Sequence, residues 1–241
     1  MKTAAIIQAR MGSTRLPGKV LRQVLGKPLL SYQLERIRQA EKVDEIIVAT
    51  TTEEIDDEIV HFCQSENILC FRGSEQDVLS RYYEASKLTD ANVIVRLTSD
   101  CPLIDPEVID KVIGAYTESS DYVSNVMQRT YPRGMDVEVF SKELLGKIHQ
   151  YAKTESDREH VTTYVRDQPD LFQVVDVLHD INYSKLRLTI DTAEDFQLVK
   201  NIMEALNQVK PQFRLDDIIS VLNDHPEWLK INQHIEQKRW K

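Results

Sequence analysis

The chain has 241 residues, of which 29% are charged and 41% hydrophobic, and its formal net charge is −9. That length is enough for one large α/β domain, no apolar run reaches the roughly 18 residues of a membrane-spanning helix, and the N-terminus lacks a signal-peptide core. Three cysteines without C-x-x-C spacing predict neither a disulfide framework nor a zinc site. We therefore expect one cytoplasmic domain over residues 1–241 that crosses no membrane.

Apolar, β-branched runs alternate with segments of helical period along the chain. In chain order we predict strands at residues 4–8, 45–50, 68–71, 92–97, 122–125, 137–140, 172–177 and 186–190. We predict helices at 29–39, 53–64, 77–88, 106–116, 142–150, 157–167, 193–206 and 215–223, and a packing helix in the tail after Pro226, which contains Trp228 and Trp240. Because a helix connects each of the first four strands to the next, the pattern predicts an α/β fold of Rossmann-like type, with a mainly parallel twisted sheet flanked by helices.

Three loops that follow predicted strands contain polar or charged residues. They comprise residues 9–19 after the first strand, 99–102 after the fourth, and the loop that begins at Asp191 after the last. Ligands of parallel sheets bind beyond the carboxyl ends of the strands. We therefore expect the functional residues on one rim of the sheet, formed by these loops.

The first loop combines small residues with cations and belongs to a basic stretch, residues 1–34, which contains no acid. Small residues let backbone amides approach phosphate oxygens, and Arg and Lys neutralise them. The loop is not a Walker A motif, because five residues separate Gly12 from Gly18 and Val20 follows Lys19. A compact cationic segment on an acidic body suits a nucleoside triphosphate rather than a nucleic acid, although a solvated surface turn is the alternative interpretation.

Asp100 and Asp191 each follow a predicted strand directly. A hard cation bound to phosphates prefers oxygen ligands and keeps several waters, so we expect these two carboxylates to hold Mg²⁺. The alternative for Asp100 is a turn or helix cap before Pro102. The alternative for Asp191 is an N-cap for the helix near Ala193.

Three segments are similar, in the expected order, to the blocks of one family. They read A-R-x-G-S-x-x-L-P-G-K at 9–19, R-L-T-S-D-C-P-L-I-D at 96–105 and R-L-T-I-D-T-A-E-D at 187–195. The family is that of the cytidylyltransferases that activate acylneuraminate and 3-deoxy-manno-octulosonate, and the resemblance covers about residues 3–206. The chain most resembles a bacterial branch associated with spore coat polysaccharide biosynthesis, through Y-P-R-G-M-D-V-E at 131–138 and R-E-H-V at 158–161.

The resemblance implies a fold of the nucleotide-diphospho-sugar transferase type with a small inserted arm at about 125–180 for acceptor binding or dimerisation. It also implies CTP and a sugar or sugar-acid acceptor as substrates, pyrophosphate as a product, Mg²⁺ as the cofactor and a homodimer. Met11 and Val20 stand where acylneuraminate-activating members commonly have Gly and Asn. Neither change removes a phosphate-binding charge, but both argue against sialic acid as the acceptor.

With this resemblance, three groups of site residues can be named. The catalytic residues expected are Arg10, Lys19, Asp100 and Asp191, the last two as metal ligands. The nucleotide-binding residues expected are Ala9, Arg10, Gly12, Ser13, Thr14, Arg15, Lys19, Arg72, Arg81 and Ser99. The acceptor-binding residues expected are Arg133, Asp136, Glu138, Arg158 and His160, with Arg158 a candidate to act across a dimer interface.

Other interpretations stay open from the residues alone. Asp136 and Glu138 also fit the exposed face of a half-buried strand, and His160 fits a helix surface. A nucleotide-sugar glycosyltransferase would use a related fold and a metal, but such enzymes commonly contain a D-x-D motif, which the sequence lacks. A non-catalytic nucleotide-binding protein is the second alternative.

Overall fold

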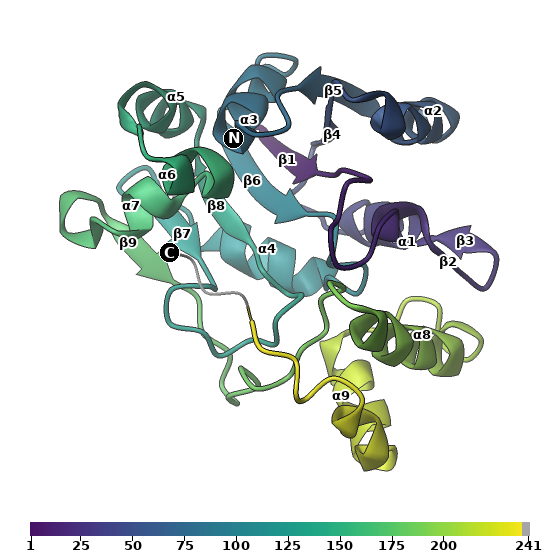
Figure 1. The fold of residues 1–241 in the computed structure, drawn as a ribbon. Coiled ribbons are helices and arrows are strands. Elements are labelled where there is room, and N and C mark those ends of the chain that lie inside the picture. Colours follow the sequence, from purple (N-terminus) through teal and green to yellow (C-terminus); the bar gives the residue numbers. More distant parts are fainter. Residues whose placement is uncertain (238–241) are drawn as a thin grey trace.

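Seven strands form one sheet, and helices cover both of its faces (Figure 1). The structure is a computed structural model, and it describes residues 1–237. The strands run across the sheet in the order β5-β4-β1-β6-β8-β7-β9. Their bounds are β1 (Thr3–Gln8), β4 (Glu45–Thr51), β5 (Leu69–Gly73), β6 (Val93–Thr98), β7 (Tyr122–Ser124), β8 (Glu138–Ser141) and β9 (Val174–Asp176).

Strands β5, β4, β1 and β6 pair in parallel, while β8 runs antiparallel to both of its neighbours, β6 and β7. The α-helices are α1 (Leu29–Ile37), α2 (Asp57–Ser65), α3 (Val78–Ser86), α4 (Pro106–Gly114), α5 (Lys142–Tyr151), α6 (Glu155–His160), α7 (Thr163–Arg166), α8 (Ala193–Asn207) and α9 (Leu215–Asp224). The predicted α/β fold with a mainly parallel, helix-flanked sheet is confirmed.

The two faces of the sheet bury separate apolar clusters, because successive side chains of a strand point to opposite faces. On β1, Ala5 and Ile7 belong to one cluster, while Ala4 and Ile6 belong to the other. The first cluster packs under helices α1, α2, α4, α8 and α9. The second packs under α3, α5 and α7, so the fold has three layers.

The register of the parallel strands brings the predicted loops to one edge. Gln8, at the end of β1, pairs with Ala49 on β4 and with Thr98 on β6. Beyond the ladder, the Ala9 amide donates to the Ala49 carbonyl at 3.1 Å, and the Ser99 amide donates to the Gln8 carbonyl at 3.1 Å. The loops after β1 and β6 therefore start side by side.

The prediction of a strand at 186–190 is wrong. Only an isolated bridge joins Arg187 to Arg133, with backbone hydrogen bonds from the Arg133 amide to Leu186 and from the Leu188 amide to Arg133. The neighbouring segment does not continue as a strand, because Gly134 has a φ of 100° and lies against the backbone of Leu188. The segment is extended and buried, which is why its sequence reads as a strand.

The helix predicted at 157–167 is broken into α6 and α7. A capping box formed by Thr154 and Asp157 starts α6 earlier than predicted. Val161, with a φ of 64°, ends it. The Val161 side chain is fully buried, so packing in the second cluster accompanies this unfavourable backbone conformation.

Two further local differences concern short elements. A hairpin of β2 (Gln23–Val24) and β3 (Lys27–Pro28) was not predicted. Its turn residues, Leu25 and Gly26, both have positive φ, as a type I′ turn requires. In the tail, Pro226–Lys230 is a 3-10 helix in which Trp228 stacks on His225. The other tail residue named from the sequence, Trp240, lies outside the described residues.

The range 125–180, predicted as an insertion, contributes β8 and β9 to the central sheet and α5 to α7 to one face. Its role in dimerisation stays a prediction. Among residues 1–237, the structure has no helix with the length and apolar character needed to span a membrane.

Candidate active site

The loop after β1 is held in shape by its own backbone and by a buried carboxylate. Asp56 accepts a hydrogen bond from the Met11 amide at 2.7 Å, and the Met11 carbonyl accepts from the amides of Ser13 and Gly18 at 2.8 and 2.9 Å. Gly18 has a φ of 66°, which favours glycine, and the 3-10 helix Lys19–Leu21 follows it. The loop therefore directs the Lys19 side chain toward the sheet edge.

The ammonium group of Lys19 lies between the two carboxylates named from the sequence. Its Nζ is 2.9 Å from Oδ1 of Asp191 and 3.5 Å from Oδ2 of Asp100, and it donates to the Ile190 carbonyl at 2.6 Å. The side chains of Lys19 and Asp191 are only 12% and 14% exposed. The three loops predicted to share one rim meet at this group.

Burial and charge act in opposite directions on these residues. Burial by itself lowers the pKa of Lys19, but Asp100 and Asp191 outweigh it, and the pKa is raised. Burial alone raises the pKa of Asp191, yet Lys19, Arg15 and Arg187 bring it below the ordinary value of 3.8. Lys19 and Asp191 are therefore both charged at neutral pH.

Asp100 and Asp191 are tied together through the backbone as well. The Asp100 carbonyl accepts hydrogen bonds from the Ile190 amide at 2.8 Å and from the Thr189 hydroxyl at 3.2 Å. The Thr98 hydroxyl donates to Oδ1 of Asp100, which leaves Oδ2 facing Lys19. These contacts fix the spacing of the two carboxylates although no strand joins the segments.

The donor set suits a hard divalent cation. Two carboxylates and the Ile190 carbonyl surround one point that a cation, the Lys19 ammonium, already occupies. Within residues 1–237, no cluster of three or more His, Cys, Asp or Glu could hold a metal ion. Mg²⁺ bound by one or two carboxylates takes its other ligands from water and substrate phosphates, so two carboxylates are sufficient.

Two arginines of the loop reach outward from the same rim. Arg15 Nη2 lies 3.1 Å from Oδ2 of Asp191, and Arg10 Nη1 lies 3.1 Å from a carboxylate oxygen of Glu75. Both arginine side chains are more than 40% exposed. The exposed Arg10–Glu75 pair is worth less than about 1 kcal/mol, so a phosphate can replace Glu75 at little cost.

Arg81 on α3 is a buried cation, and two of its three guanidinium nitrogens are unpaired within residues 1–237. The residue is 2% exposed, and its Nε and Nη1 find no hydrogen-bond partner among the described residues. Burial lowers the pKa of this guanidinium, and its charged neighbours include Arg10, Asp56 and Glu75. By contrast, Arg72 is satisfied by the carbonyls of Thr51 and Glu53.

The small residues of the predicted site line the start of the two loops. Gly12 and Thr14 are exposed, while Ala9 and Ser99 are buried at the ends of β1 and β6. Ser13 Oγ accepts a hydrogen bond from the Leu16 amide at 3.3 Å, so this hydroxyl helps to fold the loop.

Glu138, predicted as an acceptor-binding residue, does not reach the rim. It is 4% exposed on β8, where it pairs with Arg96 and accepts hydrogen bonds from the hydroxyls of Tyr122 and Thr162. The alternative interpretation, in which Glu138 lies on the exposed face of a half-buried strand, is also wrong. β8 lies between β6 and β7 and is buried on both faces. Burial alone raises the pKa of Glu138, but Arg96 outweighs it and the pKa is lowered.

Two of the remaining acceptor candidates, on α6, are held by local contacts. Arg158 donates to the His149 carbonyl and pairs with Asp77, the N-cap of α3. The His160 Nε2 lies 3.9 Å from a Glu159 carboxylate oxygen. Arg158 thus lies against the start of α3, and neither residue is among the contacts of Lys19.

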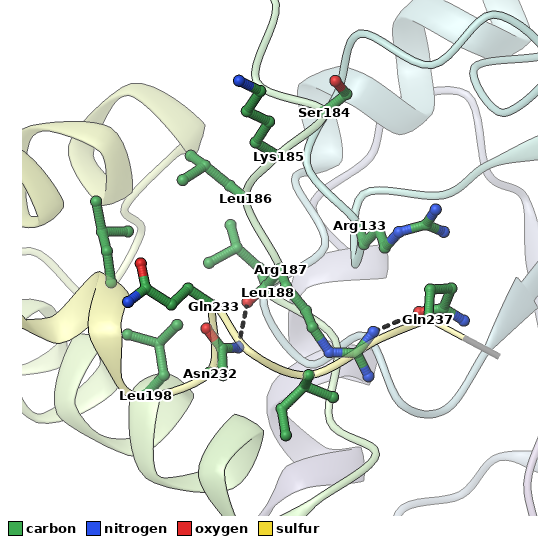
Figure 2. Close-up of a pocket in the computed structure, with 12 residues that line it drawn as sticks. Arg133, Ser184, Lys185, Leu186, Arg187, Leu188, Leu198, Asn232, Gln233 and Gln237 are labelled. Carbon is green, nitrogen blue, oxygen red and sulfur yellow. Dashed lines mark hydrogen bonds between the residues drawn. The ribbon is translucent and has the colours of Figure 1, made fainter.

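The other two acceptor candidates, Arg133 and Asp136, lie in the segment that bridges to Arg187, four residues before Asp191. Asp136 accepts two hydrogen bonds from Arg129, at 2.6 and 2.8 Å. Arg133, half-buried, lines a cavity of about 490 Å³ together with residues 184–188 and the tail (Figure 2). Burial lowers the pKa of Arg133, and Arg129 and Arg187 lower it further.

Arg187 was quoted in a motif but given no role. Its guanidinium bonds to Asp195 through Nε at 2.8 Å and Nη2 at 2.9 Å, and Nη2 also lies 2.9 Å from Oδ2 of Asp191. The spacing Arg-x₃-Asp-x₃-Asp is the only sequence signal for this contact. Asn232 in the tail, which also contacts Asp195, has no signal at all.

Comparisons with known proteins show the family and the fold. The spore coat polysaccharide biosynthesis protein SpsF of Bacillus subtilis is 36% identical over 92% of this chain and 94% of its own length. The solved structure of a cytidylyltransferase from Leptospira borgpetersenii superposes with a TM-score of 0.91 at 34% identity, over 99% of this chain and 100% of that one.

A solved CMP:2-keto-3-deoxy-manno-octonic acid synthetase complexed with CTP superposes with a TM-score of 0.63 over 85% of this chain and 99% of that one. At 18% identity it shows a shared fold. A sequence model described as "Cytidylyltransferase" matches residues 4–239. With that match, and with the SpsF relative aligned over nearly its full length, the chain belongs to the cytidylyltransferase family.

Proposed function

We propose that this protein transfers CMP from CTP to a sugar or sugar acid and releases pyrophosphate, with Mg²⁺ as its cofactor. The observation that carries the proposal is the convergence of Lys19, Asp100 and Asp191, which are far apart in sequence, at the rim where three loops meet. Family membership supports nucleotidyl transfer. The CTP complex of a protein with the same fold supports CTP as the donor.

In this reaction an acceptor oxygen attacks the α-phosphorus of CTP. A new P–O bond forms while the bond between the α-phosphorus and the oxygen that bridges to the β-phosphate breaks. The proton of the acceptor hydroxyl passes to water, and pyrophosphate leaves with the bridging oxygen. Mg²⁺, when bound, polarises phosphate oxygens and offsets their charge. Asp100 and Asp191 would hold it, while Lys19, Arg15 and Arg10 stabilise the negative charge that develops on the leaving group.

Nucleotide entry requires two rearrangements of side chains. Lys19 must leave the carboxylates, because its ammonium occupies the point between them. Arg10 must exchange Glu75 for a phosphate. In both changes a phosphate takes the place of a carboxylate as the partner of the cation, so Lys19 and Arg10 remain paired with a negative charge.

We propose that Arg81 reads the base. Two nitrogens of its buried guanidinium, Nε and Nη1, are unpaired in the described part of the chain, and cytosine offers two adjacent acceptors, O2 and N3, whereas N3 of uracil carries a hydrogen. Arg81 is close enough to Arg10 for their charges to interact, which puts it beside the phosphate-binding loop.

The remaining assignments have weaker support and belong to the same proposal. The name of the Bacillus subtilis relative supports surface or spore coat polysaccharide synthesis as the pathway. Free cysteines at all three positions fit a cytoplasmic enzyme. We also propose a homodimer, with contacts from the range 125–180, and an acceptor site that includes Arg133 and Asp136.

The test is pyrophosphate release with each of the four ribonucleoside triphosphates, Mg²⁺ and a panel of sugar acids and sugar phosphates. Release with CTP and one acceptor would support the proposal and name the acceptor class. Release only with another triphosphate would overturn the choice of donor. A nucleotide-sugar glycosyltransferase would release no pyrophosphate, a non-catalytic protein would bind CTP without turnover, and absence of CTP binding would refute the proposal.

A further inference from the structure

Arg187, Arg15 and Lys19 all contact the carboxylate of Asp191, and Arg187 is the most buried of the three. Its side chain is 6% exposed, and its two bonds to Asp195 hold the planar guanidinium in one position. From there Nη2 donates to Oδ2 of Asp191 at 2.9 Å. The other oxygen, Oδ1, is left facing Lys19 and the proposed cation site.

Asp195 supplies the rigid base of this arrangement. It is fully buried, and its Oδ2 accepts hydrogen bonds from the amides of Asp191 and Thr192 at 3.0 and 3.1 Å. Together with the Thr192 hydroxyl it forms the capping box that starts α8. Asp195 therefore fixes the backbone of Asp191, while Arg187 fixes its side chain.

The third element is the C-terminal segment, residues 226–237. Asn232, which is buried, donates from Nδ2 to the Arg187 carbonyl and to Oδ1 of Asp195, both at 2.9 Å. The Gln237 side-chain oxygen accepts from Nη1 of Arg187. Figure 2 shows both contacts, one on the backbone and one on the guanidinium of Arg187.

Between these two contacts the tail borders a cavity. Its volume is about 490 Å³, and it is lined by residues of the tail, of the segment 184–188 and by Leu198 and Arg133. Because this cavity separates the tail from the segment 184–188, the polar contacts of Asn232 and Gln237 hold the tail against Arg187.

Each of the three guanidinium nitrogens of Arg187 has a hydrogen-bond partner. Nε donates to Asp195, Nη1 to Gln237 and Nη2 to Asp191.

We propose that Arg187 is a positioning residue for the carboxylate of Asp191, and that Asn232 and Gln237 of the C-terminal segment hold Arg187 in place. The tail is then part of the apparatus that presents Asp191 to a divalent cation. This inference rests on the proposed function, in which Asp191 is a metal ligand. Outer contacts of this kind typically change metal affinity by about 10- to 100-fold when they are removed.

The experiment compares Gln237→Ala with Gln233→Ala. Gln233 lines the same cavity from the same segment and is exposed, so it is a matched control. The affinity for Mn²⁺ in the presence of CTP is measured from the electron paramagnetic resonance signal of free Mn²⁺, relative to the same CTP and Mn²⁺ without protein. The affinity for CTP without metal is measured by calorimetry. Arg187→Lys is measured in parallel, because lysine keeps the positive charge but lacks the planar guanidinium that contacts Asp191 and Asp195 together.

We expect Gln237→Ala to weaken Mn²⁺ binding several-fold and Arg187→Lys about tenfold or more, with CTP affinity in the absence of metal unchanged. The rate of both variants should be restored by a higher Mn²⁺ concentration, which a general loss of folding would not allow. Gln233→Ala should match the parent protein.

If Gln237→Ala and Arg187→Lys, folded by circular dichroism, bind Mn²⁺ as the parent does, the inference is wrong while the proposed function stands. If Arg187→Lys does not fold, Gln237→Ala and Asn232→Ala still decide the matter. If the parent itself binds no Mn²⁺ with CTP, the proposed function fails first.

Discussion

Lys19 Nζ lies 2.9 Å from Asp191 Oδ1, so a cation of the protein stands where the proposed function requires a divalent metal ion. The ammonium compensates the charges of Asp100 and Asp191, which would otherwise repel each other. It is also the group best placed to move onto a phosphate when a nucleotide arrives. Under the proposed function, the same side chain would pair with the carboxylates in the free protein and with a phosphate in the nucleotide complex.

The contact between Lys19 and Asp191 predicts that Lys19→Ala lowers turnover but raises the affinity for Mn²⁺. Turnover should fall about 100-fold or more, because a cation at the leaving group is lost. The affinity for Mn²⁺ in the absence of nucleotide should rise, because the competing ammonium is gone. Lys27→Ala is the control: Lys27 belongs to the same basic stretch but pairs with Glu35 on α1. Weaker Mn²⁺ binding by Lys19→Ala would contradict the competition.

Arg81→Met should make the free protein more stable and nucleotide binding weaker. Removing an unpaired buried cation should raise the free energy of unfolding by about 1 kcal/mol or more. The loss of charged hydrogen bonds to the base should reduce CTP affinity about tenfold. Urea denaturation and calorimetry measure the two quantities. Arg72→Met, which removes a satisfied guanidinium, should lower stability instead, and a CTP affinity unchanged by Arg81→Met would remove that residue from the site.

The lowered pKa of Asp191 predicts how the free energy of unfolding depends on pH. Because its pKa in the folded protein is lowered below 3.8, its ion pairs stabilise the fold above that value, and this contribution is lost as the pH falls through the folded pKa. The difference in unfolding free energy between the parent and Asp191→Asn should be largest near neutral pH and should shrink below pH 3.8. A difference that is constant from pH 7 to pH 3 would show that Asp191 has no such pairs.

Glu138→Gln tests whether the buried Glu138 serves the fold or the acceptor site. The substitution leaves Arg96 buried without its counter-charge, so the unfolding free energy should fall by about 3 kcal/mol. Once an acceptor has been identified, its KM should not change at a temperature where the variant is folded. A raised KM with unchanged melting temperature would restore Glu138 to the acceptor site.

Substitution of two glycines distinguishes the cost of a steric clash from the cost of backbone strain, because both have positive φ but only Gly134 has close neighbours. Gly134→Ala would place a Cβ 2.6 Å from the Leu188 carbonyl carbon, in a residue with a φ of 100°, and should cost about 3 kcal/mol of stability. Gly26→Ala has a φ of 77° and nothing within 4 Å, so it should cost only about 1 kcal/mol. Thermal melts compare the two, and equal shifts would mean that the contact with Leu188 is not tight.

The sequence was informative where local pattern determines structure. The loop 9–19 was recognisable from its glycines and cations, and Asp100 from its position after a buried strand. Glu138 was misplaced because its burial depends on the position of β8 between β6 and β7, a long-range pairing that alternation in one strand does not show. Asn232 was missed for the same reason, since it contacts Arg187 across 45 residues. The contacts of Arg187 with Asp191 and Asp195 are local, but the spacing of three charged residues does not by itself show that they pair.

The contact between Lys19 and Asp191 closes a span of 172 residues, and no strand pairing joins the second residue to the sheet. During synthesis from the N-terminus, β1, β4, β5 and β6 can assemble from neighbouring segments before Asp191 exists. Until the segment 187–191 docks against Asp100, the ammonium of Lys19 faces a single carboxylate. The order in which the chain is made thus delays the complete site to a late step of folding, so that partly folded chains lack the two-carboxylate cation site.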